Sequence, residues 1–352
     1  MRAITFQGVR RVACGEAPDP GIRSDRDAIV RVELAGLCGS DLHVYLGREV
    51  GIDPGTVMGH EFVGRVEQVG AGVRGLSVGD RVASPFTTSC GACYYCERGM
   101  SARCVSGQLF GWVERGAGLQ GAQAERVGVP LADSTLFPLP DDLDLPEALL
   151  LCDVLPTGYY CARMAEVDSD GTFAVIGLGP VGLMAVLAAG ERGARRLYAI
   201  DTIAARLARA EALGAEPIDA AHADPLEVVR GATEGRGADG VMEAVGSAEA
   251  ARLAFDLVRP GGIVATVGVH HDRGFPFSPA ESYDKNLTWK IGRCPVRSLM
   301  PEMLPLARAH RRELASLFTH RLPLAEGTAA YAMFDARRDG CLKVAFEPWP
   351  CR

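Results

Sequence analysis

Long apolar runs and an excess of positive charge are both missing from this sequence of 352 residues. No hydrophobic stretch is long enough to cross a bilayer as a helix, which argues against a membrane protein. The first twelve residues alternate like a strand and lack the apolar core of a secretion signal, so we expect a cytoplasmic location. The formal net charge is −7, whereas nucleic-acid binding needs a basic face. The sequence therefore predicts neither a membrane nor a nucleic-acid partner.

The first part of the chain, up to about residue 150, is rich in glycine, proline and short β-branched runs. Segments 28–34, 61–69 and 81–84 alternate like strands and are separated by turn signals. A hydrophobic content of 48% and a charged content of 23% are typical of a soluble globular chain. We expect a compact all-β unit with long loops here.

From about residue 155, strand-like and helical segments alternate. The expected strands are 172–176, 196–200, 216–218, 240–245, 262–267 and 287–291. The expected helices are 181–192, 203–213, 225–234 and 247–258, the third beginning at the cap Asp224-Pro225. This alternation predicts an α/β domain with a doubly wound parallel sheet. A helix at 299–310 and a short strand at 341–346 follow, and we expect this tail to rejoin the first domain.

A glycine-rich motif lies between the first of these strands and the first helix. It reads Val175-Ile176-Gly177-Leu178-Gly179-Pro180-Val181-Gly182, a G-x-G-x-x-G pattern. The three glycines permit a tight turn, close approach of backbone to a pyrophosphate, and packing of the helix on the strand. Free N–H groups at the helix start favour phosphate. The motif predicts a dinucleotide site, although a strand-end turn with packing glycines is the alternative.

The cofactor choice depends on Asp201, which ends the second strand of this domain. A carboxylate at this place can accept hydrogen bonds from both hydroxyls of an adenosine ribose. It would repel the 2′-phosphate of NADP. The sequence therefore predicts NAD.

Four of the eleven cysteines are gathered in one short segment. Cys90, Cys93, Cys96 and Cys104 have the spacing C-x2-C-x2-C-x7-C. Four thiolates on one tight loop close a tetrahedral Zn²⁺ site without an open position, which suits a structural role. An iron–sulfur cluster is the competing interpretation. Nothing else in the sequence indicates electron transfer.

A second group of metal-binding residue types lies nearer the N-terminus. Cys38 and His60 are plausible zinc ligands, and Asp41 could orient the ring of His60. A catalytic zinc site needs a third protein ligand and keeps its fourth position for substrate. Spacing alone does not choose this third ligand. A single buried cysteine or histidine is more often part of a core, but the company of a dinucleotide motif favours a catalytic site.

These motifs, taken in order, resemble the zinc-containing medium-chain alcohol dehydrogenases over nearly the whole chain. The resemblance rests on Cys38-x-Ser40-Asp41-x-His43, Gly59-His60-Glu61-x-x-Gly64, Val78-Gly79-Asp80-Arg81-Val82, the four-cysteine segment and Gly177 to Gly182. Segments 153–159 and 291–296 look closest to the branch around glutathione-independent formaldehyde dehydrogenases. The resemblance implies a GroES-like, β-rich catalytic domain from residues 1–153 and 295–352. It also implies a Rossmann NAD-binding domain from residues 154–294.

The resemblance also implies roles for single residues. Asp153 would complete the catalytic zinc site with Cys38 and His60, and Glu61 would lie near the metal as an alternate ligand. Many family members have cysteine here and Cys152 is adjacent, but the distance to Pro156-Thr157-Gly158 favours Asp153. Neighbouring residues on an extended chain also point in opposite directions. Contacts with NAD are implied for Thr157, Arg206 and Lys343, and an apolar wall beside the nicotinamide for Val245, Val267 and Val269.

The implied reaction moves a hydride between a substrate carbon and the nicotinamide, with Zn²⁺ as Lewis acid on the substrate oxygen. Ser40 would take the alcohol proton and pass it through the nicotinamide ribose to His43. His43 taken alone could equally be a surface histidine. Phe86 and Trp112 fall where family members line the substrate pocket, with ordinary core aromatics as the alternative.

We therefore expect an NAD-dependent zinc alcohol dehydrogenase that acts on a small alcohol, aldehyde or ketone as a homodimer or homotetramer. Two alternatives share this machinery. They are a biosynthetic dehydrogenase or reductase of a larger natural-product alcohol or carbonyl, and a small-aldehyde dismutase. A non-catalytic zinc- and dinucleotide-binding protein is a further alternative, disfavoured because every predicted zinc ligand and relay residue is present.

Overall fold

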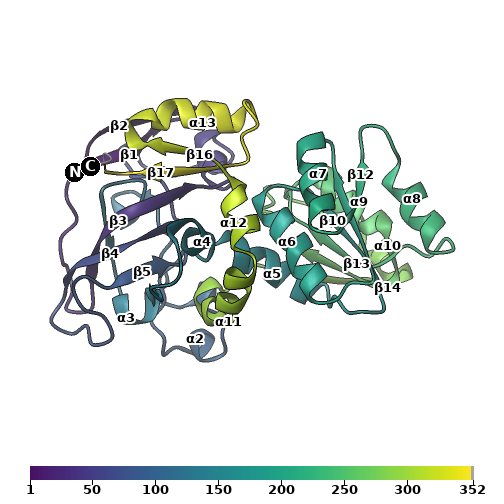
Figure 1. Cartoon of the computed structure of the whole chain (residues 1–352), viewed down its shortest axis with the longest axis horizontal. Coiled ribbons are helices and arrows are strands. Elements are labelled where there is room, and N and C mark those ends of the chain that lie inside the picture. Colours follow the sequence, from purple (N-terminus) through teal and green to yellow (C-terminus); the bar gives the residue numbers. More distant parts are fainter. Residues whose placement is uncertain (350–352) are drawn as a thin grey trace. The chain divides into compact units, whose positions relative to one another are not determined.

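The computed structural model describes residues 1–349 of the chain, which divides into two compact units. The first unit comprises Met1–Pro156 together with the segment from Pro295 onward, and the second comprises Thr157–Cys294. Figure 1 labels the elements of both. Because the chain leaves the first unit and later returns to it, the first unit is built from both ends of the sequence.

The main sheet of the first unit carries strands from distant parts of the chain. Its order is β16 (Phe318–Pro323), β17 (Lys343–Glu347), β3 (Ala28–Leu37), β4 (Phe62–Val69), β5 (Arg81–Ser84) and β9 (Phe137–Pro138), with β8 (Arg126–Val129) also pairing with β3. The pairs are antiparallel except for β16 and β17, which are parallel. The alternation of the sequence predicted β3, β4 and β5. Their inward side chains, such as Val30, Val32 and Phe62, are fully buried.

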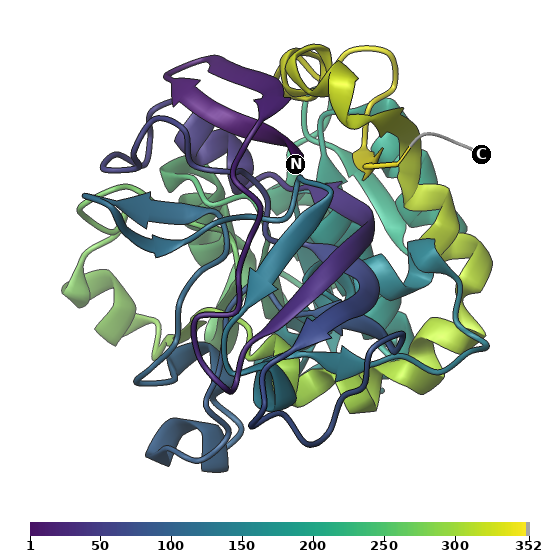
Figure 2. The ribbon, with the colours of Figure 1, turned by 90° about the vertical axis from the view of Figure 1, so that its left-hand side faces the viewer.

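Around this sheet lie short elements, including the N-terminal hairpin. The hairpin of β1 (Arg2–Gly8) and β2 (Arg11–Glu16) lies beside α13 (Gly327–Asp335), where the Thr328 hydroxyl donates to the Val12 carbonyl at 3.0 Å (Figure 2). β17 pairs with β3, so the tail becomes part of the first sheet. The other elements are α1 (Asp41–Tyr45), α2 (Tyr94–Glu97), η1 (Ser101–Arg103), β6 (Trp112–Glu114), β7 (Ala117–Leu119), α3 (Ala132–Thr135), α4 (Leu145–Leu150), α11 (Val296–Ala309), α12 (Arg311–Leu317) and η2 (Leu324–Glu326).

The second unit holds a parallel sheet with helical crossovers, which confirms the predicted α/β class. Its order is β12 (Glu216–Asp219), β11 (Arg196–Asp201), β10 (Thr172–Ile176), β13 (Ala238–Glu243), β14 (Val258–Thr266) and β15 (Thr288–Ile291). The helices are α5 (Val154–Met164), which begins three residues before this unit, then α6 (Pro180–Glu191), α7 (Ala204–Ala212), α8 (Pro225–Ala232), α9 (Ala248–Leu257) and α10 (Pro279–Asp284). Numbered within this unit, the order is 3-2-1-4-5-6, that of a Rossmann sheet.

Most predicted boundaries in this unit agree with the structure to within a few residues. Asp224 caps α8, its carboxylate accepting from the Leu226 N–H at 2.9 Å, as its place before a proline indicates. In this unit the sequence did not predict α5 and α10, and in the first unit it did not predict α1 to α4, α12 and α13. None of the helices in residues 1–349 has the combined length and apolarity that crossing a bilayer needs.

Candidate active site

Four potential metal ligands meet in the first unit. One donor atom from each of Cys38, His60, Glu61 and Asp153 lies within 4.8 Å of all the others. Cys38 follows β3, and His60 and Glu61 precede its neighbour β4, so strand pairing places them side by side. Asp153 comes from the turn before α5, 115 positions after Cys38, with its Oδ2 3.7 Å from the Cys38 Sγ. Sulfur, imidazole and carboxylate in this number are the donor types of a catalytic zinc site, so the residues present fit that ion.

The imidazole of His60 is oriented by a buried carboxylate. Its Nδ1 lies 3.3 Å from Asp41 Oδ1, and its Nε2 lies 3.6 Å from Asp153 Oδ2. Burial opposes protonation of His60, but Asp41 and Asp153 outweigh it and raise its pKa well above the usual value. A metal ligand must be a neutral imidazole, so metal binding here would be coupled to loss of a proton. The arrangement of carboxylate, histidine and donor cluster is typical of metal sites.

Behind Asp41 lies a polar chain that the sequence analysis missed. Gln123 is fully buried, and its Nε2 donates to Asp41 Oδ2 at 3.2 Å. The buried hydroxyl of Tyr331 donates to Gln123 Oε1 at 2.8 Å. Asp41 Oδ2 also accepts from the Cys38 N–H at 2.9 Å. Tyr331 lies 208 positions from Gln123, so no local spacing could have revealed this support for His60.

Ser40 contacts the cluster and is itself only partly buried. Its hydroxyl is 3.2 Å from both the Cys38 Sγ and the His60 Nε2. Ser40 caps α1, and its carbonyl accepts from the His43 N–H at 3.0 Å. Ser40 and His43 therefore belong to one helical turn, and both are partly exposed. A hydroxyl at the donor cluster and an imidazole in the same turn are what a proton relay requires.

The choice between Cys152 and Asp153 has a clear geometric answer, but not for the expected reason. Residues 151–153 form a turn rather than an extended chain, so the expectation that Cys152 and Asp153 point apart as in a strand is wrong. The carboxylate of Asp153 faces His60 and Cys38. The Cys152 thiol instead donates to the Phe62 carbonyl at 3.0 Å and is fully buried. The geometry thus brings Asp153, and not Cys152, to the other donors.

Glu61 and Lys343 form a buried ion pair beside the donors. The Lys343 Nζ donates to Glu61 Oε1 at 2.7 Å and also to Oε2, and both side chains are almost completely buried. Burial opposes the charge on Lys343, but Glu61 raises the pKa of the ammonium above its ordinary value. The structure thus places Lys343, expected at the cofactor pyrophosphate, on the carboxylate expected to be an alternate metal ligand. The positive charge also offsets one of the two carboxylates in the cluster.

The two aromatic residues predicted for the pocket lie in different settings. Phe86 is buried and meets His60 edge-on, with ring centroids 6.3 Å apart at 90°. Trp112 is partly buried on β6 and packs against the hydrophobic core of the first unit. The structure therefore brings Phe86, rather than Trp112, to the donor cluster.

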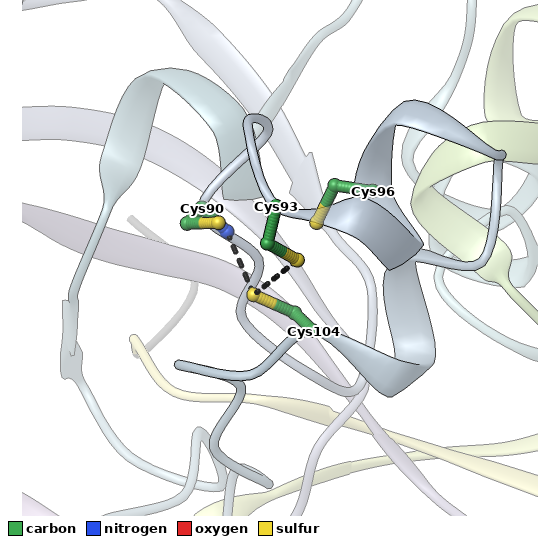
Figure 3. Close-up of side chains that lie close together, drawn as sticks. All are labelled: Cys90, Cys93, Cys96 and Cys104. Carbon is green, nitrogen blue, oxygen red and sulfur yellow. Dashed lines mark hydrogen bonds between the residues drawn. The ribbon is translucent and has the colours of Figure 1, made fainter.

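The four-cysteine segment folds into a second cluster. The Sγ atoms of Cys90, Cys93, Cys96 and Cys104 all lie within 4.8 Å of one another and point toward a common centre (Figure 3). The Cys90 N–H donates to the Cys104 Sγ at 3.1 Å. The backbone N–H of Cys96 lowers the pKa of Cys93 to about 6. None of the four cysteines forms a disulfide, so all four thiols can bind a metal. Together with their short separations, this gives the geometry of a closed tetrathiolate metal site.

In the second unit, the glycine motif has the form that the sequence predicts. Gly177 follows β10 with φ +84°, and α6 begins at Pro180. A Cβ on Gly182 would lie 1.8 Å from the Gly177 carbonyl oxygen, so only glycine allows this approach. Asp201, at the end of β11, accepts from the Leu178 N–H at 2.7 Å, and Arg206 lies 3.8 Å from its carboxylate. The acid, the basic residue and the loop therefore form one connected group.

The predicted nicotinamide wall lies on two loops of the same unit. Val245 is 47% exposed in the loop after β13, which ends at Glu243, two residues earlier than expected. Val267 and Val269 follow β14, and Val269 is 42% exposed. Thr157 is buried near the start of α5. Exposed valines at the carboxyl ends of parallel strands are in the position where Rossmann sheets bind ligands.

Comparison with known proteins identifies the family. Residues 24–141 match the family model of the alcohol dehydrogenase GroES-like domain, and residues 180–309 match that of the zinc-binding dehydrogenases. The chain is 42% identical over 346 residues to zinc-type alcohol dehydrogenase B of Aspergillus flavus, covering 96% of this chain and 79% of the relative. It is 44% identical over 292 residues to a medium chain reductase/dehydrogenase of an Acremonium species, covering 81% and 98%. A solved alcohol dehydrogenase from a Thermus species superposes with a TM-score of 0.92 at 43% identity, covering 99% of each chain.

The chain therefore belongs to the zinc-type alcohol dehydrogenases of the medium-chain family, which are NAD(P)-dependent oxidoreductases. The predicted family, fold class and enzyme class are confirmed. The likeness to the formaldehyde-dehydrogenase branch stays a prediction.

Proposed function

We propose that Cys38, His60 and Asp153 hold a catalytic Zn²⁺ and that the enzyme moves a hydride between NAD(H) and the carbon of a small alcohol, aldehyde or ketone. The observation that carries the proposal is the buried mixed donor cluster with the Ser40 hydroxyl 3.2 Å from two of its members. Bound zinc would supply a Lewis acid for the substrate oxygen. The four thiols Cys90, Cys93, Cys96 and Cys104 would hold a structural Zn²⁺.

Different residues of the chain transfer the proton, line the substrate pocket and position the cofactor. Ser40 accepts the proton of the alcohol, and His43 in the same helical turn passes it toward water. The ring of Phe86, edge-on to His60, excludes water on its side and favours an apolar substituent. We propose that Trp112 lines a more distant part of the pocket. The nicotinamide ring is held in place for hydride transfer by four residues of the second unit, Thr157, Val245, Val267 and Val269.

The cofactor preference is proposed as NAD because of Asp201. Its carboxylate is tied by the Leu178 N–H and by the N–H groups of residues 202 and 203, so its charge is fixed at the end of β11. A ribose can receive hydrogen bonds there, whereas a 2′-phosphate meets a negative charge. Asp201→Ala should lower kcat/KM with NAD by ~10- to 100-fold, because hydrogen bonds to a charged group are lost. It should leave kcat/KM with NADP unchanged or raise it. Equal losses with both cofactors would contradict the proposal.

A substrate panel tests the reaction. Zinc-loaded protein is assayed for NADH formation with primary, secondary and aromatic alcohols and with formaldehyde. NAD-linked turnover with any simple alcohol supports the proposal, and the preferred alcohol defines the pocket around Phe86. The absence of turnover despite full zinc loading would contradict it. Turnover of aldehyde without added NAD would instead indicate a dismutase.

The assembly is proposed as a homodimer or homotetramer formed through the second unit. β15 is the last strand of its sheet, and within residues 1–349 it pairs with β14 alone. Ile291 at its end is 52% exposed, and Phe275 is 64% exposed and packs on Trp289 of β15. An open strand edge with exposed apolar side chains is a surface that proteins usually cover. Light scattering of the purified protein tests this, and a monomer would contradict it. We propose a cytoplasmic location.

A further inference from the structure

A buried carboxylate in the second unit joins the two loops that carry the predicted nicotinamide wall. Glu243, the last residue of β13, is fully buried. Its Oε1 accepts from the N–H groups of Val245 and Gly246, each at 2.7 Å. Its backbone carbonyl accepts from the N–H groups of Val267 and Gly268 after β14, at 3.0 and 3.3 Å. One residue therefore fixes both loops.

The second carboxylate oxygen of Glu243 bonds to a histidine on the loop after β14. His270 Nε2 lies 3.0 Å from Glu243 Oε2, 27 positions along the chain, and the His270 side chain is 17% exposed. His270 directly follows Val269. A buried carboxylate is costly without a partner. When the imidazole is protonated it supplies the matching charge, and the contact that joins the two loops is then an ion pair.

The two loops pack closely against each other, so the pair of Glu243 and His270 also constrains the valines that the loops carry. A Cβ on Gly246, whose φ is +83°, would lie 2.4 Å from the Val269 carbonyl oxygen. A Cβ on Gly177 would lie 2.3 Å from a methyl of Val245, which places the pyrophosphate loop against the same wall. A shift of His270 therefore moves Val269 against Gly246, and with it the surface expected to meet the nicotinamide ring.

We propose that Glu243 and His270 are positioning residues that set the affinity of the second unit for the nicotinamide half of the cofactor, leaving the adenosine half unaffected. The proposal rests on the proposed NAD site. It adds two residues that none of the motifs contains, and it makes cofactor binding sensitive to the charge on His270.

The sign of that sensitivity follows from the groups around the ring. The hydrogen bond and charge of Glu243 raise the pKa of His270, burial opposes them, and Asp272 adds to the rise. The buried thiol of Cys161 also faces Glu243 and stays protonated because burial raises its pKa. The ion pair is complete below the ordinary pKa of histidine and is lost as the pH rises through the raised pKa of His270. Binding of the nicotinamide half should weaken over that rise.

The experiment compares NADH with ADP-ribose, which lacks the nicotinamide, by calorimetric titration of the full-length protein between pH 6 and 9. His270→Ala should weaken the affinity for NADH by about 10-fold, because part of the free energy of a charge-assisted hydrogen bond is lost. It should change the affinity for ADP-ribose by less than about 2-fold. Wild-type affinity for NADH should fall with rising pH, whereas His270→Ala should be flat. His271→Ala is the matched control and should behave as wild type.

The outcomes separate this inference from the proposed function. Equal weakening of NADH and ADP-ribose in His270→Ala would mean general loosening and would overturn the positioning role. Unchanged NADH binding with an unchanged pH profile would overturn it too. If wild-type protein bound neither probe, the NAD site itself would fail and the inference with it. Glu243→Gln, which keeps the hydrogen bonds to the loop and loses the charge, should remove the pH dependence while leaving the melting temperature closer to wild type than that of Glu243→Ala.

Discussion

The two donor clusters of the first unit are built in opposite ways. The tetrathiolate cluster takes every donor from residues 90–104, and three of its four cysteines are partly exposed. The mixed cluster joins donors up to 115 positions apart, and three of its four members are buried. Four thiolates fill a tetrahedron, whereas cysteine, histidine and aspartate leave a position open. One cluster suits a structural ion, and the other suits chemistry.

Their surroundings differ in the same sense. Backbone N–H groups of the cysteine segment itself support the tetrathiolate cluster, as where Cys90 donates to Cys104. Side chains from several separate segments support the mixed cluster, among them Asp41 of α1, Gln123 of a loop and Lys343 of β17. A short loop is therefore enough to organise the first cluster. The second exists only when the whole sheet has formed, which makes each of its members separately testable.

The largest difference between the clusters should appear when Asp153 is replaced. Asp153→Ala removes a ligand from the open site, and we expect kcat/KM to fall by ~1,000-fold or more because a Lewis acid contributes several kcal/mol. The protein should lose one of its two zinc ions and keep the ion of the tetrathiolate cluster. Metal analysis and NADH formation measure both effects.

The neighbouring residue provides the control. Cys152→Ala removes a thiol that bonds to the Phe62 carbonyl, so it should keep both ions and most of the activity, with a modest loss of stability from the small cavity. Loss of zinc in Cys152→Ala with retention in Asp153→Ala would reverse the assignment of the third ligand.

Replacement of Cys96 should show the opposite pattern. Cys96→Ser opens the tetrathiolate site, and we expect its metal to be lost and the melting temperature to fall by about 10 °C, as several kcal/mol would give in a domain of this size. The mixed cluster should keep its ion and its activity at low temperature. Cys14→Ser, at a partly exposed thiol of β2, is the control. Iron and visible absorbance in the wild-type protein would contradict a zinc site and support the iron–sulfur alternative.

Much of this architecture was predictable because local sequence determines it. The strand, G-x-G-x-x-G and helix sequence specifies β10, the loop and α6, and the spacing of Cys90 to Cys104 brings the four thiols together. Alternation predicted the core strands of both sheets. Pattern did not predict α5, because its start lies in a motif that reads as extended chain and contains Pro156. Helix α13 was missed because its weak amphipathic pattern gives little signal.

The supporting residues of the mixed cluster were beyond sequence reasoning. Lys343 lies 282 positions from Glu61, and Tyr331 lies 208 positions from Gln123. Such pairs form only when β17 joins β3 and α13 packs on the core. A short spacing can be recognised in a sequence, but a contact made through sheet order cannot. The resemblance therefore implied a cofactor contact for Lys343 and gave no sign of its contact with Glu61.

Lys343 offers a sharper test of what keeps the mixed site open. Lys343→Met leaves Glu61 buried and unpaired, which should destabilise the zinc-free protein by about 3 kcal/mol. Zinc should offset much of this loss, because the released carboxylate lies within 4.8 Å of the other donors and can bind the ion. Zinc should therefore raise the melting temperature of Lys343→Met more than that of wild type. A chelator should also remove zinc more slowly from Lys343→Met than from wild type, and the rate of activity loss measures this.

Two further variants separate ligand capture from misfolding. Lys343→Arg keeps the charge and should resemble wild type. The double variant Glu61→Gln with Lys343→Met removes the free carboxylate, so the extra stabilisation by zinc should disappear. If zinc stabilises Lys343→Met no more than wild type, Glu61 does not reach the metal, and the mixed cluster has three ligands whatever Lys343 does.

The smallest effect on the structure and metal content concerns Ser40, which contacts the cluster without being a proposed ligand. Ser40→Ala removes the hydroxyl near Cys38 and His60, and kcat/KM should fall by about 100-fold, as for loss of one proton-transfer group. Both zinc ions and the melting temperature should be kept, because the backbone of Ser40 still caps α1. Ser40→Thr retains a hydroxyl and should recover most of the activity. A loss of zinc in Ser40→Ala would make Ser40 part of the metal-holding structure, and the contrast between a ligand and a relay residue would disappear.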